Sequence, residues 1–275
     1  MATLPEVTMR IIEIVDDPES SASDLHQVVA TDPALSTRVL KVVNSAFYGL
    51  PRQIGSINRA ISLLGLNAVK NISVAASVGN IFRDDVVNLS GFDVRDLWAH
   101  SVATATTACL IAREAKLGSS DEAFLAGLLH DVGLMVELQH DRALFMELFE
   151  RLETDGDGAP IDELTTHEQN LFSADHQDIG AALCEAWKFP KALVAAAAHH
   201  HDPSVLAGDD ASIPWIVHVA DRVATRCTGG FRLDLPTLEI DSGAFEAIGV
   251  GRVRLEAITA ALPACLGEVE LSMAA

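Results

Sequence analysis

Histidine and aspartate side chains recur through the second half of the chain in a pattern that suits divalent-metal chemistry. Imidazole and carboxylate ligands together favour borderline or hard ions such as Fe, Mn or Zn. Most of these residues have apolar neighbours, and buried ionisable groups need partners or a metal. Together they predict a metal-binding cage. The candidate ligands are His100, His130, Asp131, His176, the histidines at 199–201 and Asp221.

Each candidate also has an ordinary structural explanation when it is taken singly. His100, in the middle of an apolar helix, can be a hydrogen-bonded core histidine. His130 and Asp131 can be a surface histidine beside a capping aspartate. His176 can be an exposed residue in the first turn of a helix, although that position also disfavours protonation and leaves a neutral imidazole ready to bind metal.

The last candidates have alternatives of the same kind. The histidines at 199–201 end an alanine-rich helix, where cationic side chains would interact favourably with the helix C-terminus. Asp221 can pair with Arg226, or less well with Arg222, because adjacent residues on a helix do not face each other. These separate explanations do not account well for the occurrence of the whole set on separate helices. The joint occurrence favours a metal site.

Helical spacing of apolar residues predicts an all-α fold, with no sustained alternation typical of strands. Pro33 suits a first helical position, and Ser56 caps a helix that ends at Gly65. The polar stretch 83–93 predicts a subdomain boundary, which gives an N-terminal helical subdomain, 1–92, and a C-terminal helical subdomain, 93–275. In the second, we expect helices at 94–117, 121–138, 141–152, 161–171, 176–187, 190–201 and 213–227, then two or three short helices from residue 234.

The His130 and Asp131 pair lies within the predicted helix 121–138. Adjacent residues on a helix diverge by about 100°, so both can reach one metal only if the helix faces the ion edge-on. The pair alone is therefore a weak signal.

The charge balance excludes several classes of function. Nineteen Lys and Arg against 39 Asp and Glu give 19 − 39 = −20. This charge argues against direct binding of nucleic acid, which needs clustered basic residues, and against anionic membrane surfaces. The N-terminus lacks the features of a signal peptide, and the four scattered cysteines are typical of reduced core residues. We therefore expect a cytoplasmic protein.

The order of these motifs, together with several segments of the first half, resembles the HDOD proteins, bacterial signalling relatives of the HD-domain phosphohydrolases. The resemblance covers nearly the whole chain. It rests on TDPALS (31–36), VVNSAFYG (42–49) and AISLLGL (60–66), and on LWAHS (97–101), LAGLLHDVG (125–133) and DHQDIGAALCEAWKFP (175–190). It implies an all-helical, two-lobed fold in which an N-terminal helical lobe packs on a C-terminal HD-like lobe. Family members mostly act as regulatory modules, and many have lost part of the metal set.

The resemblance also implies which residues would bind metal. Related cyclic-dinucleotide phosphodiesterases carry ligands in the order His, His-Asp, His, His-His, Asp. The resemblance matches this order to His100, His130, Asp131, His176, His200, His201 and Asp221. Asp96 stands where some relatives place a further acidic ligand. His199 looks like an extra residue, although a one-position shift of register would exchange it with His201. In such a cage two ions, bridged by Asp131, would lower the pKa of a bound water.

Two departures from the phosphodiesterases count against cyclic-dinucleotide hydrolysis. Leu134 stands where those enzymes have a lysine that contacts phosphate, and HDPSVLAGDD replaces their Gly-Tyr-Pro segment. The replacement is acidic, with Asp202, Asp209 and Asp210, and would repel a phosphate.

The sequence thus favours a bacterial regulatory module that acts through protein–protein contacts, with a basic protein as a reasonable partner. The alternative is a metal-dependent phosphohydrolase of unknown substrate. A third hypothesis is a metal that only holds the C-terminal helices together.

Overall fold

The computed structural model confirms the all-α fold class. It describes residues 6–17, 19–45, 48, 50, 52–79, 88–89, 92–156, 158–228, 231–240 and 242–273. Within these ranges the only strands are β1 (Asn88–Leu89) and β2 (Phe92–Asp93), which have two residues each and pair antiparallel. None of the described helices is long and apolar enough to cross a membrane.

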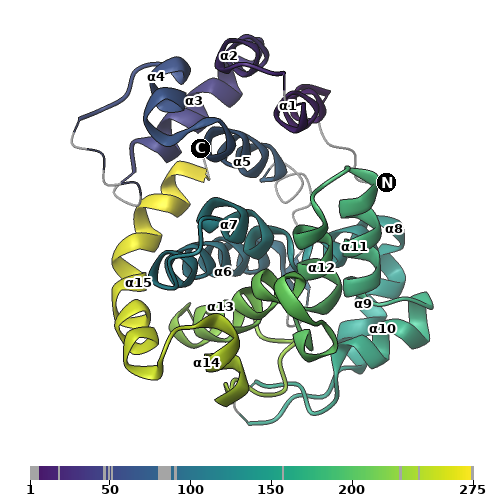
Figure 1. Cartoon of the computed structure of the whole chain (residues 1–275). Helices are drawn as coiled ribbons and strands as arrows, with labels where there is room; N and C mark the ends of the chain where they lie inside the picture. Colours follow the sequence, from purple (N-terminus) through teal and green to yellow (C-terminus); the bar gives the residue numbers. More distant parts are fainter. Residues whose placement is uncertain are drawn as a thin grey trace. The chain divides into compact units, whose positions relative to one another are not determined.

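The chain divides into two compact units (Figure 1). The larger unit comprises residues 85–262, and the smaller unit comprises residues 3–84 and 263–275. The subdomain boundary expected between residues 92 and 93 lies close to the start of the larger unit and stays a prediction.

The smaller unit is built from α1 (Glu6–Asp16), α2 (Ala22–Ala30), α3 (Pro33–Val43), α4 (Ile57–Leu64) and α5 (Leu66–Val78). The predicted local signals operate here. Pro33 is the first residue of α3, and the Asp32 side chain accepts a hydrogen bond from the Leu35 amide at 2.9 Å. Ser56 caps α4, which ends before Gly65. Helix α5 is buried along nearly its whole length and contacts α1 and α3.

The larger unit holds all the predicted metal ligands. Its long helix α6 packs against α7 and α13, and α11 packs against α8 and α12. The helices are α6 (Val94–Glu114), α7 (Ser120–Leu129), α8 (Val132–His140), α9 (Arg142–Arg151), α10 (Leu164–Phe172), α11 (His176–Ala186), α12 (Lys191–His199), α13 (Ser212–Thr228), α14 (Ser242–Ile248) and α15 (Arg252–Met273), with short 3-10 turns at Pro203–Val205 and Gly208–Ala211. The end of α15, from Pro263, belongs to the smaller unit.

Two sequence-based helix assignments are wrong. The predicted helix 121–138 is two helices, because α7 ends at Leu129 and α8 begins at Val132. Asp131 has a ψ of 14°, outside the helical range, and this residue breaks the helix. The region after residue 234 holds one short helix and one of 22 residues, α15, rather than two or three short helices. Pro263 lies inside α15.

Gly133 fixes how closely α8 approaches α11. A Cβ atom added at Gly133 would lie 2.0 Å from the carbonyl oxygen of His176 and 2.8 Å from its Cα. Such distances are sterically forbidden, so only glycine allows this approach. The contact sets the start of α11, and hence His176, against the helix that follows Asp131.

Candidate metal centre

All seven predicted ligands converge in the core of the larger unit. His100 projects from the middle of α6, and Asp221 from the middle of α13. His130 and Asp131 occupy the break between α7 and α8, which lets two adjacent residues turn toward one place. His176 is the first residue of α11, while His200 and His201 directly follow α12.

One group of ligand atoms forms around the Oδ2 atom of Asp131. This oxygen lies 3.1 Å from His130 Nε2 and 3.8 Å from His100 Nε2. His100 Nε2 in turn lies 3.2 Å from the Oδ1 atom of Asp221. Two ligands about 2.1 Å from one tetrahedral ion are ~3.4 Å apart, so these separations fit a shared ion.

A second group forms around the other oxygen of Asp131. Its Oδ1 atom lies 3.4 Å from His200 Nε2 and 3.9 Å from His176 Nε2. His176 Nε2 is also 3.0 Å from His201 Nε2. The two carboxylate oxygens of Asp131 therefore face different groups of histidines. Each oxygen would therefore be available to a divalent ion held by the histidines that it faces.

Hydrogen bonds on the far side of three imidazoles orient their Nε2 atoms toward the centre. The Nδ1 atom of His130 lies 2.8 Å from the Gly127 carbonyl oxygen, and that of His200 lies 3.1 Å from the Ala197 carbonyl oxygen. The Nδ1 atom of His176 lies 2.8 Å from a carboxylate oxygen of Glu168. Because each acceptor takes the Nδ1 proton, the Nε2 lone pair is left for a metal.

Glu168 is therefore a supporting residue that sequence reasoning missed. It lies in α10, is completely buried, and also accepts the His176 backbone amide at 3.1 Å. Its position eight residues before His176 is no recognised ligand spacing, so the sequence carries no signal for it.

We predict that Glu168→Gln weakens metal binding about 10- to 100-fold, the usual cost of losing a partner that orients a ligating histidine. Isothermal titration of the purified chain with a divalent metal measures this. Glu185→Gln, an exposed change on α11, is the matched control. Equal affinity in both variants would mean that Glu168 has no part in orienting His176.

The donor set fits a divalent ion. His100, His130, Asp131, His176, His200 and Asp221 have completely buried side chains. The Nε2 atoms of His130 and His200 have no hydrogen-bond partner. The two carboxylate oxygens of Asp131 and the two of Asp221 also lack one. Buried polar atoms of native proteins are rarely left in this way. A bound cation would satisfy all of them together.

Electrostatics around the centre supports the same fit. Burial lowers the pKa of His130, but the neighbouring Asp131 carboxylate outweighs burial and raises it to about 9. For His176, burial is outweighed by Glu168, and the pKa rises to about 10. These carboxylates thus stabilise positive charge on the two imidazoles.

A further buried carboxylate, Asp234, was missed by the sequence analysis. The Asp234 carboxylate lies close to ligand atoms of Asp131 and His200, and it also lies close to ligand atoms of His201 and Asp221. Within each of these two sets, all the ligand atoms lie within 4.8 Å of one another. Burial, and then the Asp131 carboxylate, raise the pKa of Asp234 well above its usual value. The flanking Leu233 and Leu235 are the one available sequence signal.

Other residues considered in the sequence lie away from the ligand sets. Asp96 is exposed on α6. His199 is partly exposed and joins none of the sets, whereas His200 and His201 do, which favours the first of the two registers. Arg226, considered as an alternative partner of Asp221, donates to the Leu238 carbonyl. The nearer cation is Arg222, whose Nη1 lies 3.9 Å from Asp221 Oδ2.

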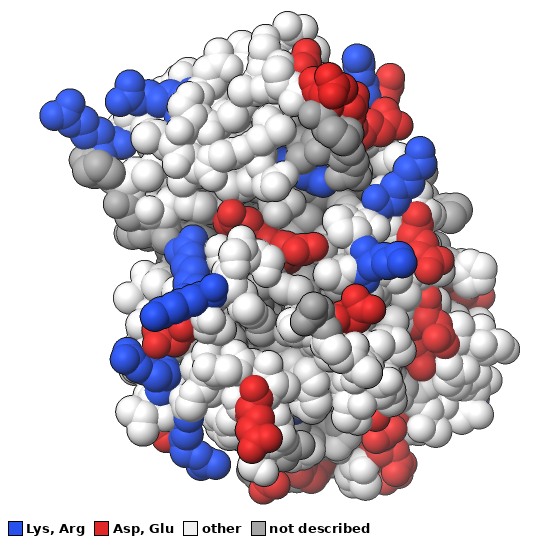
Figure 2. Space-filling model, viewed as in Figure 1, with Lys and Arg blue, Asp and Glu red and all other residues white. Residues whose placement is uncertain are grey.

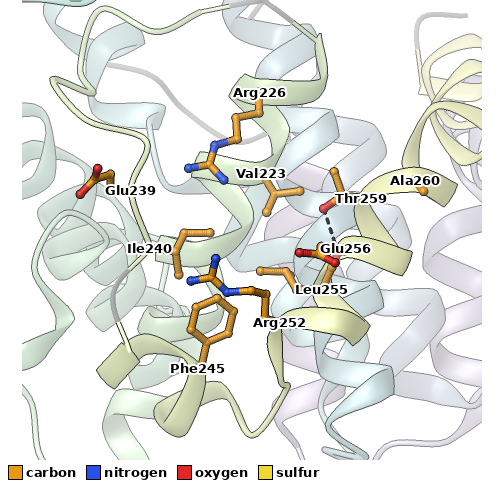
Figure 3. A pocket seen from close by; sticks show the side chains of 10 residues that line it. All are labelled: Val223, Arg226, Glu239, Ile240, Phe245, Arg252, Leu255, Glu256, Thr259 and Ala260. Atoms are coloured by element: carbon orange, nitrogen blue, oxygen red, sulfur yellow. Dashed lines mark hydrogen bonds between the residues drawn. The ribbon is translucent and has the colours of Figure 1, made fainter.

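A cavity of about 410 Å³ reaches the edge of the centre. His201, Arg222 and Asp234 line it, and Glu163 and Asp202 are among its acidic wall residues. A larger cavity of about 590 Å³ lies elsewhere, between α13, α14 and α15 (Figure 3). Arg226 and Arg252 project into the larger cavity from opposite sides, but none of the metal-ligand candidates lines it. Of these two cavities, the smaller one is the one that reaches the centre.

Comparison with known proteins identifies the family. The HDOD domain model matches residues 1–203. An uncharacterized protein of Treponema pallidum (strain Nichols) is 26% identical over 211 residues, which are 72% of this chain and 38% of that protein. The chain thus spans well under half the length of this relative.

Solved structures share the fold. An HDOD domain protein of unknown function from Geobacter sulfurreducens is 23% identical, with a TM-score of 0.72 over 99% of this chain and 92% of that one. A "Putative phosphohydrolase" from Shewanella amazonensis SB2B is 24% identical, with a TM-score of 0.73 over 99% and 93%. A "Putative signal transduction protein" from Marinobacter aquaeolei VT8 is 21% identical, with a TM-score of 0.74 over 100% and 60%. With the domain match over most of its length and this shared fold, the chain belongs to the HDOD domain family.

Proposed function

We propose that the chain is a regulatory HDOD module of bacterial signalling that acts through protein–protein contacts and holds a divalent-metal centre in its larger unit. The observation that carries this proposal is a set of candidate metal ligands that is almost entirely closed to solvent. Catalytic metal sites keep a position open for water and substrate, whereas structural sites are filled by protein ligands. The burial of six of the seven candidates fits the second kind.

The metal-binding residues would also hold the larger unit together. His100, His176 and Asp221 come from three different helices, and Asp131 lies between two more. When bound, divalent ions would supply positive charge to the buried carboxylates and tie these elements to one point. The centre would therefore make the packing of the unit depend on metal, a property suited to a signalling module.

Features around the centre support a regulatory role over catalysis. Leu134, at the position where related phosphodiesterases carry a lysine, is completely buried in α8 and presents no charge to a phosphate. The cavity next to His201 has acidic side chains in its wall, Glu163 and Asp202 among them. These would repel an anionic substrate.

A metal-dependent phosphohydrolase is the second candidate function, and Arg222 is the observation that favours it. Leu134 replaces the lysine that contacts phosphate in related enzymes, but Arg222 lines the cavity beside His201. Its Nη1 donates to the His218 carbonyl at 3.0 Å, which fixes the side chain in place. In this role, bound divalent ions would activate a water and stabilise charge on a phosphoryl oxygen.

Metal analysis paired with a turnover assay separates these functions. We expect anaerobically purified protein to hold divalent metal, to lose it in the His130→Ala variant, and to show no turnover of bis(p-nitrophenyl) phosphate after loading with Mn²⁺ or Fe²⁺. Turnover by the wild-type chain that disappears in the variant would establish the phosphohydrolase instead. Protein that retains no metal and takes none up would contradict both.

The partner is proposed to be a basic protein surface. The net charge of −20 favours basic partners over nucleic acid. On the face of the larger unit seen in Figure 2, acidic side chains gather over α8 to α10 and basic ones over α15. Binding through the acidic region would weaken steeply as salt is added.

A further inference from the structure

Asp234 lies in a tight turn that is anchored on both sides. The turn follows α13 and is closed by a hydrogen bond of 3.0 Å from the Leu235 amide to the Arg232 carbonyl. Leu235 is buried, and the Phe231 ring packs edge-on against the rings of Phe92 and His100, each with centroids 5.9 Å apart. The apolar anchors hold the turn against the metal centre, so the position of Asp234 is set by packing.

The Asp234 carboxylate is buried without a hydrogen-bond donor. Its side chain has no exposed surface, and neither of its oxygens has a hydrogen-bond partner. Its Oδ2 atom lies 3.8 Å from His201 Nε2, and the carboxylate belongs to compact sets with Asp131 and His200 and with His201 and Asp221. A buried carboxylate beside two others is strongly unfavourable unless a cation lies among them.

We propose that Asp234 is an additional ligand of the metal centre and closes it on the side of the cavity that reaches His201. This inference rests on the proposed function, in which the centre holds divalent metal. Asp234 lines that cavity together with His201, at the position where an open catalytic site would expose the metal to water or substrate. In this assignment, the Asp234 carboxylate occupies the ligand position that an open catalytic site leaves to water or substrate.

The charge balance of the centre agrees with this assignment. Asp131, Asp221 and Asp234 contribute three negative charges, and two divalent ions contribute four positive ones. Without Asp234 the two ions would carry two uncompensated charges in a buried site; with it they carry one. The assignment also makes segment 231–240 part of the metal-dependent structure, although it lies beyond the residues that the family model matches.

The Asp234→Asn variant tests the assignment, because it keeps the size of the side chain and removes its charge. The probe is titration of the full chain with Mn²⁺ and, separately, with Zn²⁺. We expect affinity to fall at least about tenfold in the variant, and the rise in melting temperature on metal addition to shrink. Glu163→Gln is the control, since Glu163 lines the same cavity but is exposed. It should bind as the wild type does.

The outcomes distinguish this inference from the proposed function. If the wild-type chain binds neither ion, the proposed metal centre fails and Asp234 with it. If the wild type binds and Asp234→Asn binds equally well, the centre stands and the assignment of Asp234 is wrong. If the variant does not fold, hydrogen exchange of the wild-type chain with and without metal tests the assignment of Asp234 instead. Amides of 231–240 gain protection on metal binding if Asp234 is a ligand, and unchanged exchange there overturns the inference.

Discussion

Replacing Asp131 with alanine is expected to remove bound metal from both halves of the centre at once. Its Oδ2 atom faces His100 and His130, and its Oδ1 atom faces His176 and His200. In the proposed centre, loss of one histidine would leave the other half intact, whereas loss of the carboxylate that faces both halves would take a ligand from each. We expect the affinity for both ions to fall by more than about 100-fold, beyond the effect of a supporting residue.

Metal content per chain after gel filtration, measured by mass spectrometry, provides the test. Asp96→Ala is the matched control, because Asp96 is an exposed aspartate one turn before His100 on the same helix. The control should retain the full metal content. An Asp131→Ala protein that keeps one ion would show that the residue serves a single position and does not bridge.

Replacing Gly133 with alanine is expected to cost about 3 kcal/mol or more of the free energy of unfolding, the upper range for overpacked sites. In most helices this substitution stabilises by about 0.5–1 kcal/mol. Here the new Cβ would lie 2.0 Å from the His176 carbonyl oxygen, which belongs to the backbone and has little freedom to move. Steric overlap therefore outweighs helix propensity.

Urea unfolding of the variant measures this loss. Gly118→Ala is the control, since a Cβ there meets nothing within 4 Å. If Gly133→Ala folds at all, separation of α8 from α11 would also displace His176, so metal affinity should fall as well. A variant as stable as the wild type would mean that the α8–α11 contact adjusts freely.

The fold was largely predictable because its signals are local. Helix periodicity, the Ser56 cap and Pro33 each depend on residues a few positions apart, and each is found as expected. The break at Asp131 was not predictable in this way, because apolar residues continue through 121–138 without a glycine or proline at the break. The break itself lies at Asp131, whose backbone leaves the helical range.

Some residues of the candidate site could be predicted from the sequence, and others could not. The seven predicted ligands could be found because their order resembles that of a known family, and the structure brings all of them together. Glu168 and Asp234 could not be found, since an isolated acidic residue in a sequence is most often a solvated one. Only the fold, through the Phe231 anchor and the α10–α11 contact, places these carboxylates in the interior.

Burial of the centre also sets how quickly an ion can be exchanged. Of the predicted ligands only His201 keeps exposed side-chain surface, 18% of it. An ion held by the other residues can escape only when this corner of the larger unit opens, and such local openings take microseconds to seconds. The residence time of the ion would then follow the opening rate. A higher concentration of chelator would not shorten this residence time. The chain would therefore stay in its metal-bound state for some time after the free metal is gone.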